Sequence, residues 1–258
     1  QPCSCTPARQ RVRLRFILLG LAAFVAALLV VLPASWFAGA LPPQLGCGNL
    51  SGSIWRGQCS GLSVAQANGQ PLRLDTLDWQ LHPLALLRGR LQADVSIAGA
   101  DVAARGNLTV QSGGRLTLEA LSGRIGLDHA RLAALPSGWS ASAEARELSL
   151  RFAEGRIQQL GGALLAHQLR DARGTAFGDF RLEFPPTQSP PFRGTLADAG
   201  GPMQLKAQLE LNADQSWQMQ GTIMLRPGAP PGLGGALDQL APADINGLRN
   251  FRLEGAAR

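Results

Sequence analysis

The sequence predicts a mainly β protein: a single N-terminal transmembrane helix, then an antiparallel curved β-sheet or β-sandwich-like domain with a few short helices. Three observations support this fold class. An apolar run without a charged residue covers 16–32. Beyond residue 36, apolar and polar residues alternate with a period of two, as expected for strands with one buried face. Turn signals rich in Gly, Asn and Asp separate these segments at the short intervals typical of hairpins.

The N-terminal segment has the length and charge pattern of a membrane anchor. Its 17 apolar residues, Phe16 to Leu32, at about 1.5 Å each, span most of a ~30 Å hydrocarbon core. Basic residues precede it at every second position, namely Arg9, Arg11, Arg13 and Arg15. Lys and Arg beside a span stay on the cytoplasmic side, so these arginines determine the topology and predict a cytoplasmic N-terminus.

The sequence therefore predicts three parts: a cytoplasmic segment 1–15, an anchor 16–33 and an extracytoplasmic β-rich domain 36–258. A weak repeat opens at Gly52 and again at Gly162 and predicts halves 45–136 and 137–258. A cleaved signal peptide is the alternative, because Ala38-Gly39-Ala40 is similar to a cleavage site. The apolar run is longer than the ~7–15 residues of a signal core, which favours a retained anchor.

The strand pattern is clearest near the C-terminus. Over Met203–Leu211 every odd position is apolar, and the even positions carry Gln204, Lys206, Gln208 and Glu210. The same alternation is present over Leu91–Ile97, Val102–Val110 and Phe180–Phe184. Successive strands of this kind, joined by short turns, predict an antiparallel meander.

Helical and irregular segments are few. Short helices are predicted over Pro83–Leu87, where proline suits a first turn, and over Leu127–Leu135 and Gly235–Leu240, each before a proline. Two proline-rich segments, 185–191 and 227–231, are predicted to be loops outside the hydrogen-bonded ladder.

The charge balance argues against a nucleic-acid partner. The net charge is +6, but four of the 24 basic residues lie just before the anchor, so the remaining 20 nearly balance the 18 acidic residues. Basic residues do not alternate with aromatic residues, as a nucleic-acid surface would require.

The four cysteines divide between the two sides of the membrane. Cys3 and Cys5 precede the anchor, whereas Cys47 and Cys59 follow it and face the oxidising side. The second pair flanks a Gly-rich turn, and a disulfide between them can staple a hairpin. Two buried free thiols are the alternative.

No set of residues supplies catalytic or metal chemistry. The three histidines, His82, His129 and His167, share no ligand spacing with one another or with the cysteines. No G-x-S-x-G elbow exposes a nucleophile, and no Gly-Lys-Ser/Thr ending completes a phosphate loop. We therefore expect no enzymatic activity, no cofactor and no metal site.

Four blocks of sequence together resemble the type II secretion system protein N family. The first is Gly52-Ser53-Ile54-Trp55-Arg56-Gly57, and the second joins Trp79 and Pro83 to Leu87-Arg88-Gly89-Arg90-Leu91. The third, Asp198 to Leu205, contains Gly201, and the fourth is Met224-Leu225-Arg226-Pro227. Within these blocks Gly52, Trp55, Gly57, Trp79, Pro83 and Gly201 are expected to be structural positions, with Trp55 the key one.

The resemblance implies a non-enzymatic, single-pass inner-membrane accessory subunit of the machine that exports folded proteins. Its expected partners are other secretion subunits: the inner-membrane platform and, in some arrangements, the secretin or the pseudopilus. The family is also similar, more distantly, to AsmA-like proteins, so periplasmic lipid binding or lipid transfer is the alternative function. A sealed core between strands would favour the first reading, and an open apolar groove would favour the second.

Overall fold

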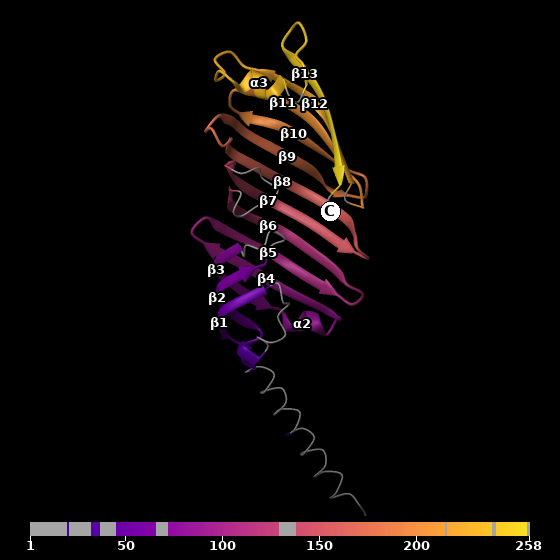
Figure 1. The fold of residues 1–258 in the computed structure, drawn as a ribbon. Coiled ribbons are helices and arrows are strands. Elements are labelled where there is room, and N and C mark those ends of the chain that lie inside the picture. Colours follow the sequence, from indigo (N-terminus) through magenta and orange to yellow (C-terminus); the bar gives the residue numbers. More distant parts are fainter. Residues whose placement is uncertain are drawn as a thin grey trace, which may run out of the picture.

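A computed structural model describes residue 20 and residues 32–36, 45–65, 72–128, 138–214, 216–238 and 241–256. These residues form one 13-stranded sheet in which the strand order follows the chain from β1 to β13 (Figure 1). Apart from its residues 20, 32 and 33, the predicted anchor lies outside the described ranges. Within those ranges, no helix has both the length and the apolar character needed to cross a bilayer.

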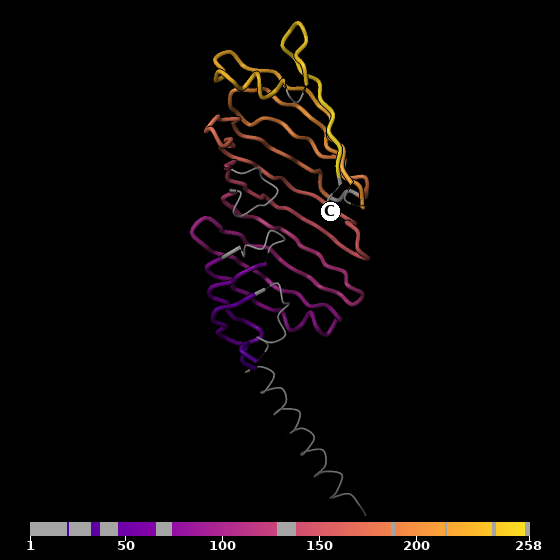
Figure 2. Tube along the Cα trace, in the orientation of Figure 1, coloured from indigo at the N-terminus to yellow at the C-terminus, as the bar shows by residue number. Residues whose placement is uncertain are grey.

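The strands are joined as consecutive antiparallel hairpins, which Figure 2 traces from the β1 end to the β13 end. Their bounds are β1 Leu45–Gly52, β2 Arg56–Val64, β3 Leu72–Leu81, β4 Arg90–Gly99, β5 Val102–Gln111, β6 Arg115–Asp128, β7 Ser140–Ala153, β8 Arg156–Arg170, β9 Ala176–Gln188, β10 Phe192–Gly200, β11 Met203–Leu211, β12 Ser216–Leu225 and β13 Leu248–Ala256. Two short helices are described, α2 Pro83–Leu86 and α3 Leu233–Asp238.

The predicted mainly β fold and curved antiparallel sheet are confirmed, but the sandwich-like alternative is wrong. Every strand pairs with its neighbours in the sequence, so the described strands build one continuous layer and no second sheet packs against it. A sandwich needs some strands to leave one sheet and join another, and the short hairpin connections of this meander do not allow that crossing.

The sheet bends at bulges in its long central strands. Ala120 in β6, Glu147 in β7 and Gln168 in β8 have positive φ angles of 53°, 49° and 54°. Each lies where the pairing register shifts. Such bulges add one residue to a strand, bend it and increase its twist. They curve the layer, and they also decide which side chains face inward.

The helix predictions near residues 83 and 235 are confirmed as short helices. The prediction of a helix from Leu127 is wrong at its start, because Leu127 and Asp128 end β6; residues 129–137 lie outside the described ranges. The prediction for 185–191 is wrong in part, because Pro185 and Pro186 belong to β9. They lie where the β8–β9 register shifts, a place that tolerates a missing N–H donor.

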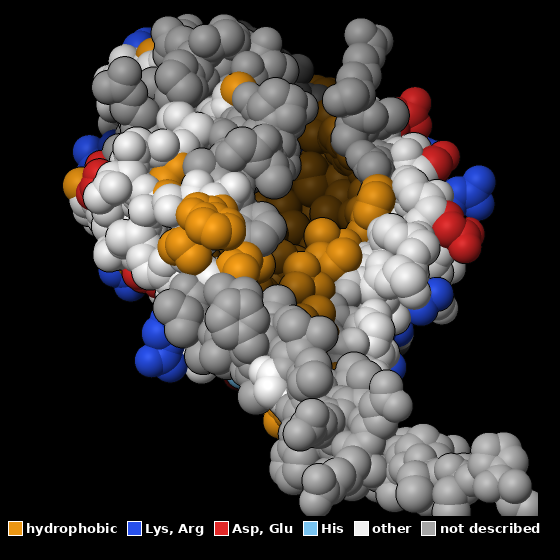
Figure 3. Space-filling view, turned by 90° about the horizontal axis from the view of Figure 1, so that it is seen from below, with side chains coloured by type: hydrophobic (Ala, Val, Ile, Leu, Met, Phe, Trp, Pro, Cys, Tyr) orange, Lys and Arg blue, Asp and Glu red, His pale blue; other side chains and the backbone are white. Residues whose placement is uncertain are grey.

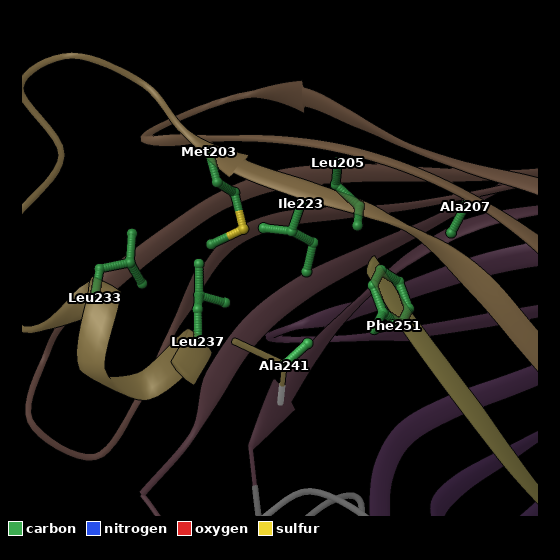
Figure 4. Close-up of a cluster of buried hydrophobic side chains, with 8 residues drawn as sticks. All are labelled: Met203, Leu205, Ala207, Ile223, Leu233, Leu237, Ala241 and Phe251. Atoms are coloured by element: carbon green, nitrogen blue, oxygen red, sulfur yellow. The ribbon is translucent and has the colours of Figure 1, made fainter. Parts of the chain in front are cut away.

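Two clusters of buried side chains lie at opposite ends of the stack of strands. The distal cluster joins β11, β12 and β13 to α3, and its members are Met203, Leu205, Ala207, Ile223, Leu233, Leu237, Ala241 and Phe251 (Figure 4). The proximal cluster contains Cys59, Leu62 and Leu74. A disulfide joins Cys47 of β1 to Cys59 of β2, as predicted, and staples this end of the sheet.

Candidate functional site: an apolar trough

The concave face of the sheet is an apolar surface that continues from strand to strand. We call it the trough, and Figure 3 shows it end-on as a hollow lined with hydrophobic side chains, with the charged side chains outside. The register places on this face Leu77 and Trp79 of β3, Val95 and Ile97 of β4, Leu108 and Val110 of β5, Leu118 and Leu121 of β6, Leu148 and Leu150 of β7, Leu160 and Leu164 of β8, Leu182 and Phe184 of β9, Leu209 of β11 and Met219 of β12.

The bulges keep this face apolar along the longest strands. In β6, Leu118 pairs with Leu150, and Leu121, three residues later, pairs with Leu148. Without the extra residue at Ala120, strict alternation would turn Leu121 to the opposite face. The bulge therefore lets one strand bend while both of its apolar segments face the trough.

The trough is an open groove in its middle. The buried clusters lie at its two ends. Between them, most of the apolar side chains of β4 to β8 are only half-buried, and Leu164 of β8 is 36% exposed. Among the residues that the structure describes, no second layer of side chains covers this part of the sheet. Of the two arrangements considered from the sequence, the described residues form the open one.

Helix α3 closes the distal end of the trough. Figure 4 shows Leu233 and Leu237 of α3 directed toward Met203 and Ile223 of the sheet. Leu233 has no exposed surface. The helix is held by Asp238, whose Oδ1 accepts hydrogen bonds from Nη2 and Nε of Arg249 at 2.6 and 3.2 Å. Arg249 occupies a trough-facing position opposite Ile223 and is buried.

A second ion pair stabilises the loops beside helix α3. Asp198 of β10 pairs with Arg226, which follows β12, and the same guanidinium donates to the carbonyl of Gly201 at 2.8 Å. The other carboxylate oxygen of Asp198 accepts the backbone N–H of Leu205 at 2.9 Å. Gly201 itself has φ +128° and packs so closely on Gly178 that a Cβ would lie 2.6 Å from its Cα. Only glycine fits there.

The proximal end is organised around one tryptophan. The Trp79 ring lies across Gly57 of the neighbouring strand, where an added Cβ would be 2.2 Å from a ring atom. Its indole N–H donates to the carbonyl of Ile54 at 3.0 Å. The ring therefore binds the β1–β2 turn to β3.

The predicted structural residues lie in two places. Gly52, Trp55, Gly57 and Trp79 come together at the proximal end; Trp55 is half-buried, and its carbonyl accepts the N–H of Leu81 at 2.7 Å. Pro83 begins α2 close by, because Leu81 ends β3. Gly201 lies at the distal end with Asp198 and Arg226.

Sequence reasoning missed the two ion pairs. Asp198 and Arg226 stand inside the blocks that resemble the family, yet their contact depends on how β10 and β12 each pair with β11. Arg249 left a clearer signal. Phe251 and Leu253 share its side of the alternation in β13, so a charged residue there predicts a buried cation that needs a partner.

The outer face carries scattered charge pairs. His82 lies 2.8 Å from Asp94, and His167 lies between Asp179 at 3.2 Å and Glu144 at 3.4 Å; His129 lies outside the described ranges. The N–H of Gln168, and then His167, hold the pKa of Asp179 below its usual value. Among the described residues, no group of three or more His, Cys, Asp or Glu side chains is placed to hold a metal ion.

Comparison with known proteins identifies the family. No curated protein matches the chain, and no solved structure matches it. The family model for type II secretion system protein N matches residues 43–252, which include nearly all of the sheet from β1 into β13. The chain belongs to the type II secretion system protein N family.

Proposed function

We propose that this chain is a non-enzymatic inner-membrane accessory subunit of the type II secretion apparatus, acting through protein contacts in the periplasm. The extent of the family match carries the proposal. It covers 43–252 and so takes in the disulfide staple, the trough and both ion pairs at the distal end. The whole curved sheet, and not one motif within it, is the unit that the chain shares with the family.

The sheet offers a specific means of contact. Among the described strands, β13 pairs with β12 alone, so one of its edges presents free backbone donors and acceptors. Such an edge can receive an extended segment of a partner by strand addition. Thirteen strands separated by about 4.8 Å set this edge roughly 60 Å from β1, measured along the curved sheet.

Deleting the gene is expected to stop or strongly reduce export of type II substrates while the substrates still fold in the periplasm. The measurement is the substrate fraction in culture medium against periplasm. Chains with His82→Ala or His167→Ala should restore export, because the proposal assigns them no chemistry. A deletion strain that exports normally would contradict the proposed role.

The proposed topology has its own test. Alkaline phosphatase fused after Arg258 should be active, because the enzyme is active only outside the cytoplasm.

Lipid binding in the trough is a second candidate function, supported by the open apolar middle of the groove. Monomeric proteins rarely expose a continuous apolar surface of this extent without a ligand or partner. Leu164 and Leu182 pair across β8 and β9 in this middle part. A fatty acyl chain lying along the groove would cover them.

Purified full-length protein is expected to crosslink to a photoactivatable fatty acid, and Leu164→Arg with Leu182→Arg should reduce the yield at least tenfold. The arginines place two charges in the groove. Glu183→Arg is the matched control, because Glu183 lies beside Leu182 on the same strand but on the exposed outer face. Equal labelling of both variants at equal circular dichroism signal would exclude the groove as the lipid site.

A further inference from the structure

Exposed leucines gather around the short helix α2. The exposed fractions are 76% for Leu84, 43% for Leu86 and 85% for Leu87. No residue of α2 is buried. Leu84 and Leu87 therefore contribute little to the packing of the described core, and a patch of exposed leucines marks an interaction surface.

Two arginines accompany these leucines. Arg88 and Arg90 are exposed and lie between Leu87 and Leu91. None of the ion pairs between described residues involves either of them. We call Leu84, Leu86, Leu87, Arg88 and Arg90 the α2 patch. Leucines beside unpaired guanidinium groups match the chemistry of a bilayer surface, which offers apolar chains beneath phosphate groups.

Hydrogen bonds place the α2 patch next to the segment that leaves the predicted anchor. The carbonyl of Leu32 accepts the N–H of Ile54 at 3.0 Å, and Pro33 forms a bridge with Ser53. The adjoining Trp55 carbonyl accepts the N–H of Leu81, and Pro83 then opens α2. Trp36, on the same segment as Leu32, is 76% exposed. Figure 1 shows α2 at the β1 end of the stack.

We propose that the α2 patch is a membrane contact that enters the headgroup layer of the bilayer to which the anchor belongs. Leu84 and Leu87 insert among the upper acyl chains, and Arg88 and Arg90 bind the phosphates of anionic lipids. The contact gives the domain a second attachment to the bilayer and turns the proximal end of the trough toward the membrane. This inference rests on the proposed function in one respect: the proposed anchor brings the β1 end of the sheet, and with it the α2 patch, to the bilayer.

The test uses full-length protein with Cys3→Ser and Cys5→Ser, reconstituted in nanodiscs of 70% phosphatidylethanolamine and 30% phosphatidylglycerol. Leu87→Cys carries an NBD fluorophore. Ile245→Cys carries the same label as the matched control, because Ile245 is 100% exposed but lies in the loop before β13, at the far end of the stack. We expect lipid-borne nitroxides to quench the label at position 87 at least threefold more than the label at position 245.

Arg88→Gln with Arg90→Gln is expected to halve the quenching at position 87 in anionic nanodiscs and to change little in nanodiscs of phosphatidylcholine alone. Equal quenching at positions 87 and 245 in protein that co-elutes with the nanodiscs would overturn the membrane contact. Failure to co-elute would instead contradict the proposed anchor. In that case, the labelled protein mixed with anionic vesicles gives the same comparison, and again equal signals at the two positions overturn the contact.

Discussion

Trp79→Ala is expected to lower the free energy of unfolding by about 3 kcal/mol, and Gly57→Ala by about 2 kcal/mol. The first variant removes a ring that packs against the β1–β2 turn and leaves the Ile54 carbonyl without its indole donor. The second places a methyl group 2.2 Å from an atom of the same ring and 2.8 Å from the carbonyl oxygen of Ser51. The ring must then leave the position in which it binds this turn.

The double variant separates this contact from general damage to the strands. The clash with the ring disappears when the ring is removed, and only the contact with the Ser51 carbonyl oxygen remains. The cost of Gly57→Ala in the Trp79→Ala background should therefore be at least about 1 kcal/mol smaller than in the wild type, a non-additivity typical of residues in direct contact. Guanidinium unfolding followed by far-ultraviolet circular dichroism gives all four stabilities.

Gly235→Ala is the control for the glycine change. An added Cβ at Gly235 in α3 meets nothing within 4 Å, so this variant should be neutral or slightly stabilising. Strictly additive effects of Gly57→Ala and Trp79→Ala would mean that the ring and the glycine act independently, contrary to the geometry.

The strands themselves were predictable from sequence because each satisfies a local rule. Met203–Leu211 alternates without exception, and the structure makes those residues β11. The sandwich alternative failed for a reason that no local pattern records. Alternation shows that one face of a strand is apolar, but the same pattern suits a face covered by a second sheet and a face that lines an open groove.

Contacts between distant residues were the other part that the sequence left open. Gly57 and Trp79 were both singled out, yet their contact depends on the β2–β3 register, which brings residues far apart in the chain opposite each other. The positions of the bulges could not be predicted from the sequence either. Ala120 and Glu147 are ordinary residues for a strand, and only their positive φ angles reveal that the register shifts beside them.

Asp238→Ala is expected to destabilise the distal end by about 3 kcal/mol, because it leaves the Arg249 guanidinium buried without its anionic partner. The side chain of Arg249 is 8% exposed, and Asp238 supplies both of its charged hydrogen bonds. The exposed fraction of Asp238 itself is 57%, so water can approach the pair. The expected cost is therefore near the lower end of the ~3–5 kcal/mol typical of breaking a buried ion pair. The same change should release α3 from the trough, since Asp238 is its last residue.

Arg249→Met distinguishes an uncompensated charge from a loss of packing. Methionine is apolar and flexible and faces the same cluster of Met203, Ile223 and Leu237. Once the cation is gone, Asp238 has no buried partner to neutralise, so Asp238→Ala in the Arg249→Met background should cost under about 1 kcal/mol. Thermal unfolding of the four proteins, with protease cleavage at α3 as a local probe, measures both the stability and the docking of the helix. A cost of Asp238→Ala that persists unchanged in the Arg249→Met background would show that the carboxylate stabilises α3 by some route other than the buried guanidinium.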